Sequence, residues 1–284
     1  MATIQETRQY IRESIQEVYP EPEAGAIAQR LLEHVLQKSK LELSLKKDKP
    51  LTPEQEEKVK QAVKRLQESE PIQYILEEVY FYGLDLFIDK RALIPRPETE
   101  ELVDLVVKEH EGKRGLHILD VCAGSGCIPL ALAANLNVEQ VYGLEVSDGA
   151  LDVAQINGTK YNLPVRWLHQ DVFEPVQSIA PASLDIITSN PPYVLEMEKE
   201  QMRANVLKYE PHLALFVLNN DPLKYYKRIT ELGAELLKEG GKLYFEINER
   251  YGEEVKQLLL EYGFSNAEVS QDLFGKDRIV KAVK

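Results

Sequence analysis

Residues 118–133, ILDVCAGSGCIPLALA, decide the fold. They read as an apolar strand, a turn that contains Gly124 and Gly126, and a helical run that follows at once. Glycines in such a turn let the backbone bend sharply and approach a ligand with no Cβ in the way. In a parallel sheet this turn lies at the carboxyl end of a strand, where doubly wound folds bind ligands. The stretch therefore predicts an α/β domain with a ligand site at this turn.

Short apolar runs continue this pattern along the chain. Helical stretches separate them, which predicts βαβ units and a mainly parallel sheet. The last two runs are joined by residues 273–277, which predicts a hairpin added at one edge. The seven expected strands cover residues 116–121, 140–146, 165–169, 184–189, 242–248, 267–272 and 278–284.

The N-terminal region has a different periodicity. Residues 21–37 place apolar side chains every 3.6 residues, as an amphipathic helix does. Thr52, Pro53 and Gln55 form a capping-box signature at the start of another helix. Residues 79–89 have two β-rich arms around Gly83, which predicts a hairpin. We expect a small all-α domain at 1–72, a hairpin linker at 73–93, and the α/β domain at 94–284. Periodicity leaves open whether the all-α domain recognises a substrate or is a helical bundle that folds for its own sake.

Composition disfavours several classes of protein. The net charge of −13, from 34 basic and 47 acidic residues, argues against a nucleic-acid partner, which usually needs a basic surface. No apolar run approaches the ~18 residues of a membrane span, and the N-terminus resembles no signal or transit peptide. Cys122 and Cys127 are too few for a disulfide framework or a zinc site. We expect a cytoplasmic protein without metal, and buried rather than redox-active cysteines.

The ligand of the glycine turn is predicted by elimination. Pro129 stands where a dinucleotide fingerprint needs its third glycine, and no phosphate-loop motif occurs. The second strand ends in Glu145, whose carboxylate can accept both hydroxyls of a ribose. After the third strand, Asp171 can accept from an adenine amino group while Val172 flanks the ring. A nucleoside without pyrophosphate fits, and S-adenosylmethionine is the candidate. Alone, the turn could be structural and Glu145 a solvated acid.

A second motif, SNPPYVL at 189–195, follows the strand at 184–189. We expect that strand beside the first, so that Asn190 emerges next to the glycine turn. The Asn190 amide oxygen and the Pro191 carbonyl can accept hydrogen bonds, and Pro192 restricts the residue before it. Tyr193 adds a flat ring. Two acceptors at fixed spacing can bind the two N–H groups of a planar –NH2 group and aim its nitrogen lone pair at a methyl donor. No strong general base is required, because the proton can leave after the methyl group is transferred.

The chain resembles the HemK/PrmC family of N5-glutamine methyltransferases. Asn-Pro-Pro-Tyr is shared with adenine methyltransferases, but the flanking motifs narrow the choice. The similarity runs from about residue 20 to the C-terminus and includes EPIQYIL (70–76), FYGLDLFIDKRALIPRPETEELVD (81–104), YEPHLAL (209–215) and DLFGKDRIVKA (272–282).

The resemblance implies a fold, an activity and a set of site residues. The fold is a class I S-adenosylmethionine-dependent methyltransferase, Rossmann-like with a seven-stranded sheet. The activity is N5-methylation of the glutamine in the Gly-Gly-Gln motif of class I peptide chain release factors, leaving S-adenosylhomocysteine, by a monomer whose all-α domain recognises the substrate. The cofactor residues are Cys122, Ala123, Gly124, Ser125, Gly126, Glu145, Asp171, Val172 and Asn190, and the glutamine is held by Asn190, Pro191, Pro192 and Tyr193. We expect Arg96–Glu100 to be a helix start and His212 a structural residue.

This sequence departs from the family pattern in the cofactor region. Cys122 and Ala123 replace a usual glycine and threonine, Glu145 replaces a usual aspartate, and Asn248 stands where glycine is usual. These changes affect the geometry of the cofactor loop rather than the amide chemistry. Three other functions compete: methylation of a ribosomal-protein glutamine, N6-methylation of adenine in nucleic acid, and a non-catalytic cofactor-binding scaffold.

Overall fold

The computed structural model describes residues 2–284, and the chain divides into two compact units. One unit consists of the residues up to Glu78 together with Arg203–Tyr209. The other consists of Val79–Met202 and Glu210–Lys284. The domain boundaries expected at residues 72 and 93 stay predictions.

The first unit is helical. Its longer helices each bury an apolar face. The capping box expected at Thr52 is present, since Thr52 Oγ1 accepts from Gln55 N at 3.3 Å and Gln55 Oε1 accepts from Thr52 N at 3.0 Å. A segment far along the chain joins this unit, where Tyr209 Oη donates to the Glu68 carbonyl at 3.0 Å. The helices are α1 (Ile4–Ile15), α2 (Glu21–Leu36), α3 (Lys40–Leu45), α4 (Pro53–Gln67), α5 (Ile72–Leu76) and α9 (Ala204–Tyr209).

The second unit contains a seven-stranded sheet in the order β10-β11-β9-β6-β3-β4-β5. The five strands from β9 to β5 in this order run parallel, and β10 and β11 form an antiparallel hairpin at the other edge, as expected. The strands are β3 (Leu116–Val121), β4 (Val138–Glu145), β5 (Val165–His169), β6 (Leu184–Ser189), β9 (Leu237–Glu246), β10 (Ser265–Gln271) and β11 (Asp277–Val283).

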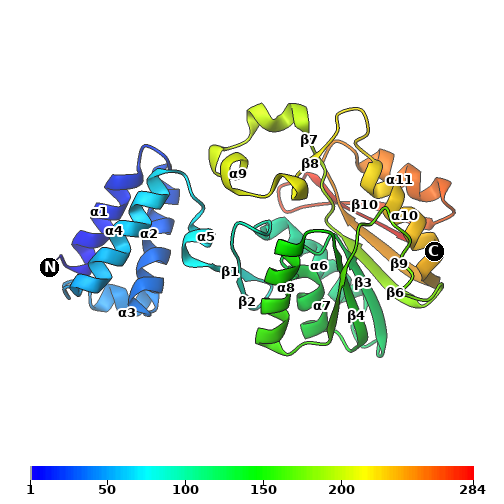
Figure 1. Ribbon diagram of the computed structural model, residues 1–284, viewed down its shortest axis with the longest axis horizontal. Coiled ribbons are helices and arrows are strands. Elements are labelled where there is room, and N and C mark those ends of the chain that lie inside the picture. Colours follow the sequence, from blue (N-terminus) through cyan, green and yellow to red (C-terminus); the bar gives the residue numbers. More distant parts are fainter. Residues whose placement is uncertain (1) are drawn as a thin grey trace. The chain divides into compact units, whose positions relative to one another are not determined.

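Helices cover both faces of this sheet. In Figure 1, α6, α7 and α8 lie on one side of it and α10 and α11 on the other. Tyr226, Ile229 and Val255, from α10 and α11, are fully buried in the main apolar core against β9 and β11. The helices are α6 (Pro97–Glu109), α7 (Cys127–Asn135), α8 (Asp148–Tyr161), α10 (Lys224–Leu236) and α11 (Gly252–Glu261).

Small elements complete the unit. The hairpin expected around Gly83 is present as β1 (Glu78–Phe81) and β2 (Leu84–Phe87). After β6 the chain forms short elements, which are β7 (Val194–Leu195), the 3-10 turns at Glu196–Gln201 and His212–Ala214, and β8 (Phe216–Val217).

One strand is longer than the apolar pattern indicates. We expected it to begin at residue 242, but β9 begins at Leu237, which is paired with Leu184 of β6. The register shifts before Lys242, where the sequence Gly240-Gly241 follows two charged residues. This irregular stretch hides the strand from a periodicity argument. No helix in residues 2–284 is long and apolar enough to cross a membrane.

A charged cluster ties α6 to the sheet. Glu109, at the end of α6, accepts from Lys242 Nζ at 2.5 Å, Lys281 Nζ at 2.6 Å and Tyr244 Oη at 2.7 Å. Partial burial raises the pKa of the Glu109 carboxyl, but the hydrogen bonds from the two lysines and the tyrosine outweigh it and lower the pKa to about 2. The carboxylate therefore stabilises the fold.

This cluster predicts acid sensitivity. Because the pKa of Glu109 is lowered on folding from 4.5 to about 2, its contribution is complete above pH 4.5 and is lost as the pH falls toward 2. We expect this loss to be about 2 kcal/mol, since partial exposure screens the contacts. Glu109→Gln should lower the free energy of unfolding in urea at neutral pH and flatten its decline in acid. The exposed Glu111→Gln is the control, and equal acid slopes in both variants would contradict the assignment.

Candidate active site

The glycine turn joins β3 to α7 in a strained backbone path. Cys122, Gly124 and Gly126 all have positive φ, at 63°, 53° and 81°. At Gly126 a Cβ would meet Trp167 Cη2 at 2.6 Å, so close packing as well as φ requires glycine. At Gly124 a Cβ would meet nothing within 4 Å. The turn is thus packed on one side and open at Gly124.

Glu145, at the end of β4, holds this turn in place. Its Oε2 accepts from Gly124 N at 2.8 Å and its Oε1 accepts from Ser147 N at 2.9 Å. The residue is 8% exposed. Each carboxylate oxygen can accept a second hydrogen bond, so ribose hydroxyls can still bind there.

An aromatic wall lies next to Asp171. Asp171 Oδ1 accepts from Phe173 N at 3.0 Å, so Oδ2 can accept from a ligand. The rings of Phe173 and Tyr225 pack 5.3 Å apart between centroids, and Lys224 Nζ lies 4.4 Å from the Phe173 centroid. Sequence reasoning missed these three residues. Phe173 directly follows the predicted Asp171–Val172 pair, whereas nothing in the sequence of α10 singles out Tyr225.

These groups line one cavity of ≈ 250 Å³ in the second unit. Most of the predicted cofactor residues line it, while Gly126 packs behind the turn instead. Further lining residues come from two segments that the sequence analysis treated as family motifs, residues 91–96 and 211–214. The predicted residues that line the cavity are Cys122, Ala123, Gly124, Ser125, Glu145, Asp171, Val172, Asn190 and Pro192.

The cavity fits a nucleoside that carries a charged amino-acid tail. Ser125 Oγ is buried and has no hydrogen-bond partner among residues 2–284, so it can serve a ligand. The acidic oxygens of Glu145 and Asp171 suit hydroxyl and amino donors, and the Phe173 and Tyr225 rings suit a planar base. No group of His, Cys, Asp and Glu in the described part of the chain could hold a metal ion.

The cysteines are placed for packing. Burial raises the pKa of the Cys127 thiol to about 12 and that of Cys122 well above its ordinary value. A thiol that stays protonated is a poor nucleophile and metal ligand. Both cysteines are free; Cys127 is buried, as expected, whereas Cys122 is only half-buried.

Asn190 follows β6 at the edge of the cavity, where its Nδ2 donates to Thr99 Oγ1 at 3.2 Å. Neither Pro191, which is buried, nor Tyr193 lines the cavity. The Tyr193 hydroxyl donates to Glu246 Oε1 at 2.9 Å, and its ring packs against the main core. Burial raises the pKa of Tyr193 well above its ordinary value, and the nearby Glu246 carboxylate adds to this, so the hydroxyl stays protonated.

The two family motifs that flank the site are joined to each other. Arg96, the residue before α6, donates through Nη2 to Glu210 Oε1 at 2.6 Å, and Glu210 Oε2 accepts from Ile94 N at 3.3 Å. Glu210 is 4% exposed, so this pair is largely shielded from water. Pro97 opens α6, as the helix-start interpretation expects. His212 packs edge-on against Phe216, with ring centroids 5.2 Å apart.

The packing of the turn makes a prediction about stability. Gly126→Ala should destabilise the protein by about 2–4 kcal/mol, because the new Cβ clashes with Trp167 and positive φ is unfavourable. Gly124→Ala is the matched control, with a cost of about 1 kcal/mol from φ alone. Thermal unfolding of both variants measures the difference. Equal midpoints would show that Trp167 does not restrict the turn.

Two family comparisons cover most of the chain. Residues 6–76 match the PrmC N-terminal domain, and residues 99–213 match the Methyltransferase small domain. In solved structures, the second unit's fold is similar to a methyltransferase from Pyrococcus furiosus, with a TM-score of 0.52 and 18% identity over 71% of this chain and 89% of the other. A 16S rRNA methyltransferase of T. thermophilus, solved with AdoMet and guanosine, has a TM-score of 0.51 and 21% identity, over 73% of this chain and 49% of the other.

Similarity over nearly the full length is found in curated relatives named release factor glutamine methyltransferase. The protein of Bacteroides thetaiotaomicron is 44% identical over 96% of this chain and 97% of its own length. The protein of Flavobacterium psychrophilum is 40% identical over 95% of each chain. The protein of Streptococcus pneumoniae is 39% identical over 81% of this chain and 80% of its own length. With these identities and a class I methyltransferase fold, the chain belongs to the PrmC family of release factor glutamine methyltransferases.

Proposed function

We propose that this protein transfers a methyl group from S-adenosylmethionine to the side-chain nitrogen of the Gly-Gly-Gln glutamine in class I peptide chain release factors. One observation carries the proposal. Asn190 lines the same cavity as Glu145, Asp171 and the glycine turn. An acceptor for a substrate –NH2 group and a nucleoside site are therefore adjacent.

The cavity residues would bind the cofactor. S-adenosylmethionine supplies an electrophilic methyl group on a sulfonium. Glu145 would accept from the ribose hydroxyls, Asp171 would accept from the adenine amino group, and Val172 and Phe173 would contact the ring. The turn from Cys122 to Gly126 would lie along the amino-acid tail, where Ser125 Oγ offers a hydrogen bond. S-adenosylhomocysteine is the expected product.

Residues 190–193 would hold the glutamine. The Asn190 oxygen and the Pro191 carbonyl would each accept one N–H of the side-chain amide. Pro192 would form part of the wall around it, and Tyr193 would anchor the segment through its hydrogen bond to Glu246. An amide nitrogen is a weak nucleophile because its lone pair is delocalised, so orientation has to supply much of the catalysis. Effects of this type reach about 7–11 kcal/mol in ideal cases. The proton can leave after transfer, which explains why no general base is needed.

The helical unit would grip the release factor. It matches the PrmC N-terminal domain, and the chain's excess of acidic residues disfavours direct contact with nucleic acid. We expect a monomer that acts in the cytoplasm, where release factors work. The boundaries 1–72, 73–93 and 94–284 are part of this proposal.

The aromatic wall is tested through cofactor affinity. Phe173→Ala and Tyr225→Ala should each weaken S-adenosylmethionine binding about tenfold, because one flat face of the adenine site is lost. Calorimetric titration measures the change. Tyr80→Ala, at a 62% exposed tyrosine of β1, is the control and should bind normally. Unchanged affinity in both wall variants would place the adenine elsewhere.

The reaction is tested by mass spectrometry of a purified class I release factor incubated with the protein and S-adenosylmethionine. The wild type should add one methyl group to the Gly-Gly-Gln glutamine. Asn190→Ala should lower turnover about 10²–10³-fold while cofactor binding survives, because one acceptor for the amide is removed. The exposed Asn220→Ala should behave as the wild type.

Two results would refute parts of this proposal. Near-normal turnover of Asn190→Ala would overturn the amide clamp. A wild type that binds S-adenosylmethionine but leaves the release factor unmodified would overturn the substrate, and a ribosomal-protein glutamine and then adenine in RNA would be the next substrates to measure.

A further inference from the structure

Glu246, at the end of β9, is a carboxylate in the interior of the second unit with an exposure of only 1%. A buried carboxylate costs stability unless its charge is compensated by hydrogen bonds and opposite charge. Stability alone therefore gives little reason to place glutamate here. Its partners suggest another reason.

Both oxygens of Glu246 accept from hydroxyl groups. Thr99 Oγ1 donates to Oε2 at 2.6 Å, and Tyr193 Oη donates to Oε1 at 2.9 Å. An ionised carboxylate has no proton to donate, so both hydrogen bonds run from hydroxyl to carboxylate while Glu246 is ionised. Burial raises the pKa of Glu246 above its ordinary value, and the bonds from Thr99 and Tyr193 and the positive charge of Arg278 oppose this rise.

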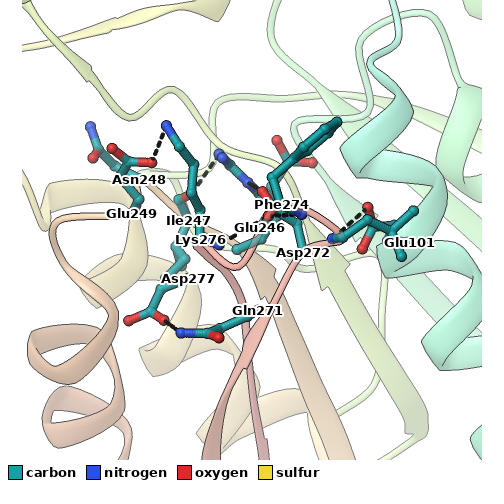
Figure 2. Close-up of polar contacts among 12 residues, drawn as sticks. Glu101, Glu246, Ile247, Asn248, Glu249, Gln271, Asp272, Phe274, Lys276 and Asp277 are labelled. Atoms are coloured by element: carbon teal, nitrogen blue, oxygen red, sulfur yellow. Dashed lines mark hydrogen bonds and ion pairs between the residues drawn. The ribbon is translucent and has the colours of Figure 1, made fainter.

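The surroundings of Glu246 are held by hydrogen bonds and an ion pair. Figure 2 shows Glu246, the last residue of β9, and residues 247–249 that follow it, beside the loop that joins β10 to β11. Asp272 in that loop accepts from the backbone N–H of Phe274 and Lys276 at 2.9 and 3.0 Å. The same side chain pairs with Arg278 at 3.2 Å, and this holds the guanidinium close to Glu246.

The direction of these bonds determines the orientation of Asn190. A threonine hydroxyl has one proton, and at Thr99 it is donated to Glu246. Thr99 Oγ1 can then only accept from Asn190, so the amide group that faces Thr99 must be the NH2. The Asn190 oxygen is left on the other side of the amide. The two ends of an asparagine amide have nearly the same shape, so hydrogen-bond partners decide which way it points.

We propose that Glu246, acting through Thr99, is a positioning residue that turns the Asn190 amide oxygen toward the substrate nitrogen. The inference rests on the proposed function, in which Asn190 accepts from a substrate –NH2 group. In the opposite orientation the Asn190 NH2 would face the substrate NH2, and two donors would repel each other. Tyr193, on the second oxygen of Glu246, is anchored by the same carboxylate.

Glu246→Gln tests the direction of the hydrogen bonds that link Glu246, Thr99 and Asn190, which we call the relay. The introduced glutamine would accept from Tyr193 through its oxygen and donate to Thr99 through its nitrogen. Thr99 would then donate to the Asn190 oxygen and turn the Asn190 NH2 toward the substrate, with every group still hydrogen-bonded. We expect kcat to fall about 10–100-fold, as for other positioning partners, with an unchanged dissociation constant for S-adenosylmethionine. Glu249→Gln, three residues along and paired with Lys276, is the control and should keep wild-type kcat.

A double variant provides the more specific test. Asn190→Asp alone should be inactive, because Thr99 cannot donate to two carboxylates at once. When it is combined with Glu246→Gln, the relay can run in reverse, from the introduced glutamine through Thr99 to the introduced aspartate, whose second oxygen faces the substrate. The pair keeps the total charge of the site. We expect at least tenfold more turnover than in Asn190→Asp. A residue with a merely structural role would not produce this rescue.

The remaining variants keep the test decisive if the glutamine variants unfold. Thr99→Val should lower kcat as Glu246→Gln does, and Thr99→Ser, which keeps the hydroxyl, should retain most of it. Wild-type kcat in Thr99→Val, or no rescue in a folded double variant, would overturn the inference. All rates are ratios to the wild type on the substrate that it methylates, so a wrong substrate appears as an inactive wild type and is distinguished from a wrong role for Glu246.

Discussion

The parallel pairing of β3 with β6 is the interaction on which the site depends. It places Val121 opposite Ser189, so the glycine turn and the Asn-Pro-Pro-Tyr segment leave the sheet side by side. Side chains reinforce the pairing, because Ser189 Oγ donates to the Val121 carbonyl at 2.7 Å and Thr188 Oγ1 donates to Asp120 Oδ1 at 2.7 Å. Residues almost seventy positions apart thereby form one cavity.

Much of the site is preorganised by carboxylates that bind the protein itself. Glu145 accepts from two backbone amides, Glu210 joins the two flanking motifs, and Glu246 accepts from two hydroxyls. Groups held in this way need little reorganisation when a ligand binds, which is how orientation contributes to catalysis. The buried charges cost stability, and Glu109 with its lysines offsets part of that cost elsewhere in the unit.

The departures from the usual family loop have physical consequences. Cys122 adopts φ of 63° where a glycine is usual, and a side chain in that region costs roughly 1–2 kcal/mol. Its side chain packs against the main core, which offsets part of this cost. Glu145, one methylene longer than aspartate, reaches Gly124 N and holds the turn directly. Asn248 donates to the Tyr193 carbonyl at 3.2 Å, a bond that glycine could not make.

The sequence by itself determined the fold class, the strands up to β6, the hairpin at the edge of the sheet and the family, because these follow from local periodicity, glycine turns and contiguous motifs. Only the tertiary structure decided how the polar groups connect. Thr99, Glu246 and Tyr225 lie far from Asn190 and Asp171 along the chain. Thr99 belongs to the motif at 81–104, but the sequence assigned it only to a helix start, and nothing local marks Glu246 or Tyr225. The early start of β9 was also not predicted, because its first residues are polar and include glycines and so lack the alternation of apolar and polar residues that marks a strand. Orientation of an amide depends on partners brought together across the sheet, and these are a property of packing rather than of local sequence.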